Sequence, residues 1–164
     1  MAREILFKAK RIDNGEWVEG SIITRKDTKR VFMVDIENIT ALRSVTTNYC
    51  DRYDWRAVEV QADTICQYTG LTDKNGNKIW ENDVVEVWWK QRTLETVCEP
   101  PKYKAIIEFG NPNSLYSWGY QLRFLEDFPF NNDILLWIDM EETGAYCEAI
   151  GNKFDNPELL GGAE

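Results

Sequence analysis

The sequence QYTGLTDKNGNKIWENDVVEVWW, residues 67–89, decides how the chain folds. Its Asn75-Gly76 pair predicts a two-residue type I′ turn, because both central positions of that turn need a positive φ. Residues 83–89 then alternate as a strand does. The two faces of that strand are Val85, Val87 and Trp89 on one side, and Val84, Glu86 and Trp88 on the other. The stretch therefore predicts a hairpin that leads directly into a strong strand.

Similar patterns along the chain predict a mainly β protein. Asn14-Gly15 predicts a further type I′ hairpin. Short strand-like runs separated by turn signals continue through the rest of the sequence. Residues 62–64 predict a short turn, and DNPELL, residues 155–160, predicts one helical turn with Asn156 as its N-cap. A division of the chain is expected near residue 60, where a polar stretch ends.

Composition limits the classes of function. The chain has 164 residues, of which 43% are hydrophobic, and its formal net charge is −9. Such an acidic protein repels nucleic-acid phosphates at long range, so non-specific DNA or RNA binding is not expected. Two local basic patches, residues 25–30 and Lys102 with Lys104, are predicted to be solvated turns or strand edges. No window approaches the ~18 apolar residues that a membrane helix needs.

The chain contains no histidine. This excludes Ser-His-Asp and Cys-His catalysis, imidazole metal ligands and the usual general base near neutral pH. The four cysteines are widely spaced and form no CxxC pair, so neither a disulfide framework nor a zinc site is expected. They are Cys50, Cys66, Cys98 and Cys147. We interpret them as thiols of a cytoplasmic protein, and the N-terminus has no signal-peptide pattern.

A calcium loop is one hypothesis for DKNGNKIWENDV, residues 73–84. Asp73, Asn75 and Asn77 match the first three ligand positions of an EF-hand. However, Lys78 stands where that loop requires glycine, and Val84 stands where it requires a bidentate glutamate. The side chains of Asp73 and Asn75 are instead expected to stabilise the turn through local bonds to the backbone. No metal or other cofactor is predicted.

Five residues form the candidate binding set. Glu81 and Asp83 share one face of a strand at i and i+2, so a paired-carboxylate centre is an alternative to a tight turn that begins the strand. Trp88 and Trp89 are adjacent and must point to opposite faces, so one of them is available for a second packed face, an interface or a groove. Trp80 is the third aromatic candidate.

Three ordered motifs resemble the YopX protein family, a group of small proteins encoded by bacteriophages and prophages. They are EILFKAKRIDNGEWVEGSII at residues 4–23, VQADTICQYTGLTDKNGNKIWENDVVEV at 60–87 and AIGNKFDNPELL at 149–160. The chain departs from the family pattern at Ala9 and at Asn82, where glycine is usual; asparagine tolerates the same left-handed conformation. The resemblance implies a mainly β fold with an N-terminal β region at residues 1–60 and an SH3-type small barrel at 61–164. It implies no established activity, cofactor or catalytic residue.

The sequence therefore predicts a phage or prophage accessory protein of the bacterial cytoplasm that acts by binding and not by catalysis. A protein partner or self-association into a homo-oligomer is expected, with Trp80, Trp88 and Trp89 as anchors and Glu81 and Asp83 setting specificity. Two alternatives stay open. One is an enzyme that uses the carboxylates with a divalent metal, and the other is a nucleic-acid-binding or DNA-mimic protein.

Overall fold

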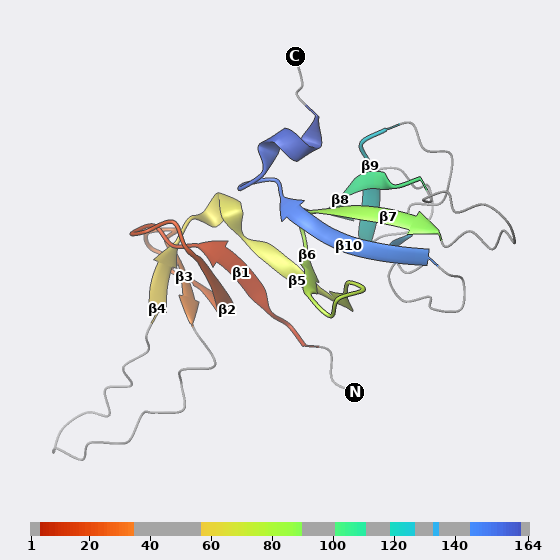
Figure 1. Cartoon of the computed structure of the whole chain (residues 1–164). Helices are drawn as coiled ribbons and strands as arrows, with labels where there is room; N and C mark the ends of the chain where they lie inside the picture. The colour runs from red at the N-terminus through yellow and green to blue at the C-terminus, as the bar shows by residue number, and fades with distance from the viewer. Residues whose placement is uncertain are drawn as a thin grey trace, which may run out of the picture. The chain divides into compact units, whose positions relative to one another are not determined.

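The protein is mainly β, as the sequence predicted. The computed structural model describes residues 4–34, 57–89, 101–110, 119–126, 133–134 and 145–161. In the described part of the chain the strands are β1 Phe7–Lys10, β2 Trp17–Thr24, β3 Val31–Val34, β4 Ala57–Val60, β5 Cys66–Thr72, β6 Lys78–Trp80, β7 Asp83–Trp89, β8 Tyr103–Gly110, β9 Gly119–Phe124 and β10 Ala145–Asn152. Two short 3₁₀ helices accompany them, η2 Ala62–Thr64 and η3 Pro157–Leu160 (Figure 1).

The chain divides into two compact units, Met1–Gln67 and Tyr68–Glu164. The boundary falls inside β5, later in the sequence than the expected residue 60. Each unit has a hydrophobic core of its own. The short turn predicted at residues 62–64 is confirmed as η2.

The strands of the N-terminal unit close on themselves. They pair antiparallel in the order β4-β3-β2-β1, and the beginning of β5 pairs with β1. The ring closes because the end of β1 also meets β4: Gln61 N–H donates to the Lys10 carbonyl at 2.8 Å, and Ile12 N–H donates to the Glu59 carbonyl at 3.1 Å. In an open sheet β4 would be an edge strand with unpaired backbone groups, and closure onto β1 protects that edge. The side chains buried inside are Ala9, Val31, Met33 and Val60.

The C-terminal unit contains an antiparallel sheet in the order β10-β7-β8-β9, with β5 and β6 as an adjoining hairpin. One face of the sheet forms the core, because strand side chains alternate between faces. The core consists of Ile79, Val85, Val87, Ala105, Ile107, Leu122, Ile134, Ala145 and Cys147. The SH3-type barrel expected for residues 61–164 stays a prediction.

The type I′ prediction is wrong at both Asn-Gly pairs. Gly15 and Gly76 have positive φ, +73° and +84°, whereas Asn14 and Asn75 do not. At the second hairpin, Gly76 N–H donates to the Asp73 carbonyl at 2.9 Å. The connection is therefore a three-residue loop whose final glycine is left-handed. The physical reason is the Asp73 carboxylate, since its Oδ1 accepts the N–H groups of Asn75 (2.8 Å) and Asn77 (2.9 Å) and favours a longer turn.

Two hairpin loops of the N-terminal unit share one geometry. In the β1–β2 loop, Gly15 N–H donates to the Arg11 carbonyl at 3.1 Å; in the β2–β3 loop, Lys29 N–H donates to the Arg25 carbonyl at 3.0 Å. Glycine takes the left-handed position in the first loop, but Lys29 takes it in the second, at φ 59°. A non-glycine residue in that region is strained by its Cβ, so the second loop carries a cost that the first does not.

The two loops predict opposite effects of exchanging the residue. We expect Lys29→Gly to stabilise the protein and Gly15→Ala to destabilise it, each by up to about 1 kcal/mol, because the change in backbone strain exceeds the opposing change in the entropy of the unfolded chain. A Cβ on Gly15 would meet no atom within 4 Å, so no clash contributes. Thermal unfolding of the two variants beside the wild type measures both shifts. Shifts of the same sign would contradict this account.

The C-terminal helical turn forms as predicted, but its cap differs. Pro157 occupies the first turn of η3, and Asn156 is the N-cap residue, yet its side chain makes no capping hydrogen bond. Asn156 Oδ1 instead accepts the N–H of Asn152 at 3.4 Å. Gly151 lies beneath this turn, where a Cβ would come within 2.5 Å of Asn156 Oδ1 and 2.8 Å of Leu159 Cδ1. The glycine therefore allows the turn to pack onto the end of β10.

Candidate functional site

The register of β7 separates the two adjacent tryptophans. Trp89 pairs with Ala145 on β10 and packs against the core, whereas Trp88 pairs with Tyr146 on the opposite face. Both rings are partly buried. Of the two candidates, Trp88 is therefore the one that does not serve the core of its own sheet.

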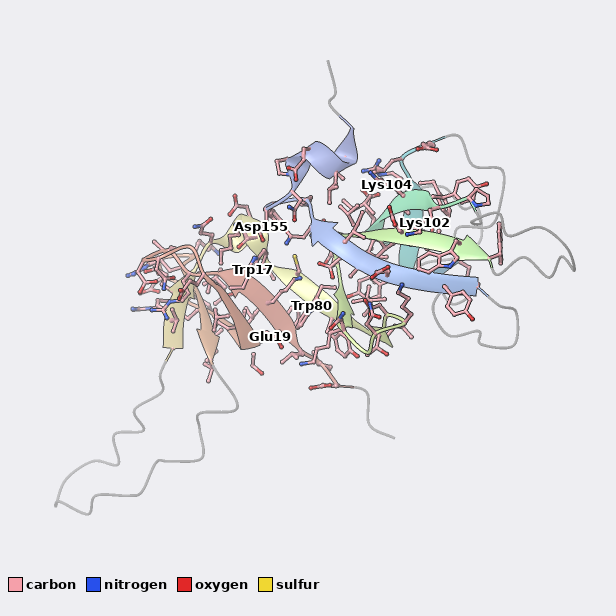
Figure 2. All side chains as sticks on the ribbon, viewed as in Figure 1. Trp17, Glu19, Trp80, Lys102, Lys104 and Asp155 are labelled. Atoms are coloured by element: carbon pink, nitrogen blue, oxygen red, sulfur yellow. The ribbon has the colours of Figure 1, made fainter. Side chains whose placement is uncertain are left out.

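Trp80 is a structural residue in this geometry. It belongs to β6 (labelled in Figure 2), is only 4% exposed, and lies 5.5 Å from the ring of Tyr68, its partner on β5. The ammonium of Lys78 lies 5.8 Å from the Trp80 ring centroid and 5.9 Å from that of Tyr68. Such cation–π contacts add to aromatic packing. The buried ring therefore stabilises the hairpin, and the predicted role as a binding anchor stays untested.

The side chain of Asp83 stabilises the turn at which β7 begins. Its side chain is buried, and Oδ2 accepts the N–H of Trp80 at 2.9 Å. Between them Asn82 adopts φ +67°, the left-handed conformation expected where the family usually has glycine. Asn82 N–H donates to the Ile107 carbonyl at 2.8 Å, and its own carbonyl accepts the N–H of Lys153 at 3.1 Å. Glu81 is partly exposed.

This arrangement predicts unequal costs for the two carboxylates. Asp83→Ala leaves the N–H of Trp80 without its acceptor in a buried place, so we expect a loss of about 1–3 kcal/mol in unfolding free energy. Glu81→Ala is the matched control, and we expect it to change stability by less than about 0.5 kcal/mol. Urea unfolding followed by tryptophan fluorescence measures both. Equal and small effects would show that the buried hydrogen bond is unimportant.

The aromatic site on the side opposite the core lies where β7 and β10 pair, and both of its rings are partly buried. We define the Trp88 face by its six members: Trp88, Tyr146, Glu86, Glu148, Lys74 and Lys102. The rings of Trp88 and Tyr146 are stacked, 5.8 Å between centroids with planes 19° apart. The ammonium groups of Lys74 and Lys102 lie 4.6 Å and 5.1 Å from the Trp88 centroid. The ring thus has an aromatic partner and two cationic ones.

Two carboxylates lie directly opposite each other beside this stack. Glu86 on β7 faces Glu148 on β10, a like-charge pair that would destabilise the sheet by itself. Each is neutralised by a lysine of the same face: Lys102 Nζ is 3.1 Å from Glu86 Oε2, and Lys74 Nζ is 2.8 Å from Glu148 Oε2. The hydrogen bond from Lys74 is the main reason that the pKa of Glu148 is lowered. The charges therefore fix the lysines against Trp88.

The turn after β5 protects the edge of β10. Lys74 N–H donates to the Cys147 carbonyl at 3.0 Å, and Ala149 N–H donates to Asp73 Oδ2 at 3.3 Å. Burial alone would raise the pKa of Asp73, but hydrogen bonds from Asn77, Asn75 and Ala149 outweigh it and lower the pKa. The two Asp73 oxygens that the calcium hypothesis required thus accept hydrogen bonds from protein N–H groups. Cys147 beside them has its pKa raised to about 12, mainly by burial.

The lowered pKa of Asp73 predicts a loss of stability in acid. A carboxyl whose folded pKa lies below its unfolded value stabilises the protein above the unfolded value, about 3.9, and that contribution is lost as the pH falls through the folded pKa. We expect Asp73→Asn to cost about 1–3 kcal/mol at pH 7 and to flatten the fall in stability below pH ~4. Urea unfolding across that range measures the slope. Glu126→Gln at an exposed position is the control, and an unchanged slope in Asp73→Asn would contradict the assignment.

The sequence suggested Trp88 as one of three aromatic candidates, beside Trp80 and Trp89, and did not indicate the residues that surround it. Tyr146, Glu148, Lys74 and Lys102 come from other segments of the chain, and strand pairing together with the bond from the Lys74 turn to Cys147 brings them to Trp88. The sequence pattern predicts Lys102 only as part of a solvated basic patch with Lys104. Cys66 and Cys147 are buried thiols as predicted, while Cys50 and Cys98 lie outside the described residues. In the described ranges no three His, Cys, Asp or Glu side chains gather where they could hold a metal ion, and no helix is long and apolar enough to cross a membrane.

The fold and the Trp88 face define a mainly β protein of two units with an aromatic and charged sheet surface. The chain belongs to the YopX protein family, whose model matches residues 6–161. It is also similar to protein EF1440 from Enterococcus faecalis, a crystal structure with 20% sequence identity and a TM-score of 0.44; the match covers 97% of this chain and 99% of that one. A comparison with curated proteins found no match.

Proposed function

We propose that this protein is a phage or prophage accessory protein that acts by binding another protein, with the Trp88 face as its anchor. The observation that carries the proposal is the stacked pair of Trp88 and Tyr146 on the side of the sheet opposite its core. Tryptophan and tyrosine are enriched among the residues that dominate binding energy at protein interfaces. We therefore propose Trp88 as the tryptophan anchor, in place of the three anchors Trp80, Trp88 and Trp89 that the sequence suggested.

The way the rings are held supports this role. Trp88 is fixed between Tyr146 and two lysines, and those lysines are themselves paired with Glu86 and Glu148. A side chain that is already ordered loses little conformational entropy when a partner covers it. A rigid sheet also positions a binding surface more accurately than a loop does. The face is thus preorganised for contact with a protein surface.

This geometry gives less support to the two alternative functions, an enzyme and a nucleic-acid-binding protein. An enzyme centred on Asp83 would need a carboxylate open to substrate, but Asp83 is buried and accepts a backbone hydrogen bond. A nucleic-acid module would need to overcome the net charge of −9. Self-association through the same face fits the proposal equally, because a second copy is also a protein partner.

Affinity purification from the bacterial host tests the proposal. We expect Trp88→Ala to reduce the recovery of specific partners about tenfold or more, because truncating a central aromatic anchor typically costs 2 kcal/mol or more, with ~1.4 kcal/mol per tenfold in affinity. Phe109→Ala removes an aromatic side chain that is 52% exposed and not part of the Trp88 face, so it is the control. Size-exclusion chromatography with light scattering tests self-association in the same variants.

Two results would contradict the proposal. One is recovery of the same proteins by the wild type and by Trp88→Ala. The other is a strictly monomeric wild type that captures nothing from the host. Thermal stabilisation by a divalent ion that Asp83→Ala abolishes would instead favour the enzyme alternative.

A further inference from the structure

The charges around the Trp88 end of the outer side of the C-terminal sheet do not balance. Strand alternation and register place the strand carboxylates Glu86, Glu148 and Glu108 on this side, and the isolated bridge to Gln121 places the exposed Asp133 beside β9, away from Trp88. Each of the three strand carboxylates has a cation of its own, and the pairs are Glu86 with Lys102, Glu148 with Lys74, and Glu108 with Arg123 at 2.8 Å. Every acidic side chain of the described strands on this side is therefore already neutralised.

Lys104 is the cation left over. It lies directly opposite Glu86 in the β7–β8 register, but Glu86 pairs with Lys102 instead. Among the described residues no carboxylate forms an ion pair with Lys104, whose side chain is partly exposed (Figure 2, where Lys102 and Lys104 are labelled). Among the described residues, the part of this side around Trp88 consequently has three lysines, Lys74, Lys102 and Lys104, for the two carboxylates Glu86 and Glu148, in a chain whose net charge is −9.

The exposed part of this side adjoins the aromatic pair. Val84 and Ile106, which are also on the outer side, are 0% and 2% exposed, so that end of the surface is covered. The end that carries Trp88 and Tyr146 is accessible, because the side chains of Lys102 and Lys74 there are 48% and 33% exposed. An incoming anion could pair with Lys104 there without breaking an existing ion pair. An incoming cation would meet only carboxylates that are already paired, and would have to displace a lysine.

We infer that the Trp88 face takes an acidic segment of its protein partner, with an Asp or Glu carboxylate on Lys104 and a neighbouring apolar or aromatic side chain on Trp88 and Tyr146. The inference rests on the proposed function and names the chemistry of the partner. A protein segment is favoured over a nucleic acid because a polyanion meets the repulsion of the whole chain, whereas one or two carboxylates meet little of it. Local charge complementarity then selects the partner and its register.

A displayed library of random peptides, selected on the full-length protein, tests this directly. We expect the enriched peptides to share an Asp or Glu next to an apolar or aromatic residue. Fluorescence anisotropy then measures the affinity of individual peptides. Lys104→Glu should weaken binding about tenfold, because a hydrogen bond between charged groups is lost.

The control must separate a local effect from an effect of net charge. Lys26→Glu changes the net charge equally, but Lys26 is an exposed residue of the N-terminal unit, so affinity should stay within about twofold of the wild type. Lys104→Gln removes the charge without reversing it and should give an intermediate loss. Thermal unfolding confirms that each variant is folded before its affinity is compared.

The possible results distinguish this inference from the proposed function. Basic peptides, or acidic ones whose binding Lys104→Glu leaves unchanged, overturn the inference alone if Trp88→Ala still abolishes binding. Peptides that bind equally well to Trp88→Ala overturn the proposed site as well, and a selection that enriches nothing counts against both. Binding of labelled oligothymidylate that Lys104→Glu abolishes would assign the surplus charge to nucleic acid and overturn the choice of a protein ligand.

Discussion

The turn between β6 and β7 is the constraint on which the C-terminal unit depends. The Asp83 carboxylate accepts the N–H of Trp80, while the two backbone groups of Asn82 bond to Ile107 and Lys153. These bonds tie the hairpin, β8 and the end of β10 to one point. They also fix the residue at which β7 begins, and a buried hydrogen bond of this kind is costly to lose.

The beginning of β7 determines which side chains are exposed. Because strand side chains alternate, a slip of one residue would send Trp88 into the core and Trp89 outward. The register with β10 instead places Trp89 opposite Ala145 at the core and Trp88 opposite Tyr146 outside it. The same register brings Glu86 opposite Glu148, which in turn requires the lysines that hold the Trp88 ring. Because side chains alternate along β7, the turn that sets the first residue of this strand also sets which side chains form the proposed binding surface.

The calcium-like stretch shows how similar residues serve a different purpose. Asp73 has the oxygen atoms that an ion would use, yet the N–H groups of Asn75, Asn77 and Ala149 occupy them. The result is a loop longer than a type I′ turn, which covers the edge of β10 and brings Lys74 to Trp88. Turn propensity in the sequence identified the position of this hairpin. It could not identify the contact of this loop with β10, because the N–H of Ala149 that bonds to Asp73 is distant in sequence.

The sequence by itself determined the mainly β fold, the positions of most turns, the left-handed conformation at Asn82 and the fact that Trp88 and Trp89 face opposite ways. All of these follow from local backbone preferences and from the alternation of a single strand. Only the tertiary structure decided which tryptophan is turned away from the core, which residues surround it and that Lys104 has no carboxylate of its own among the described residues. Those properties depend on the pairing of β7 with β8 and β10, and pairing between segments tens of residues apart has no signature in either segment alone.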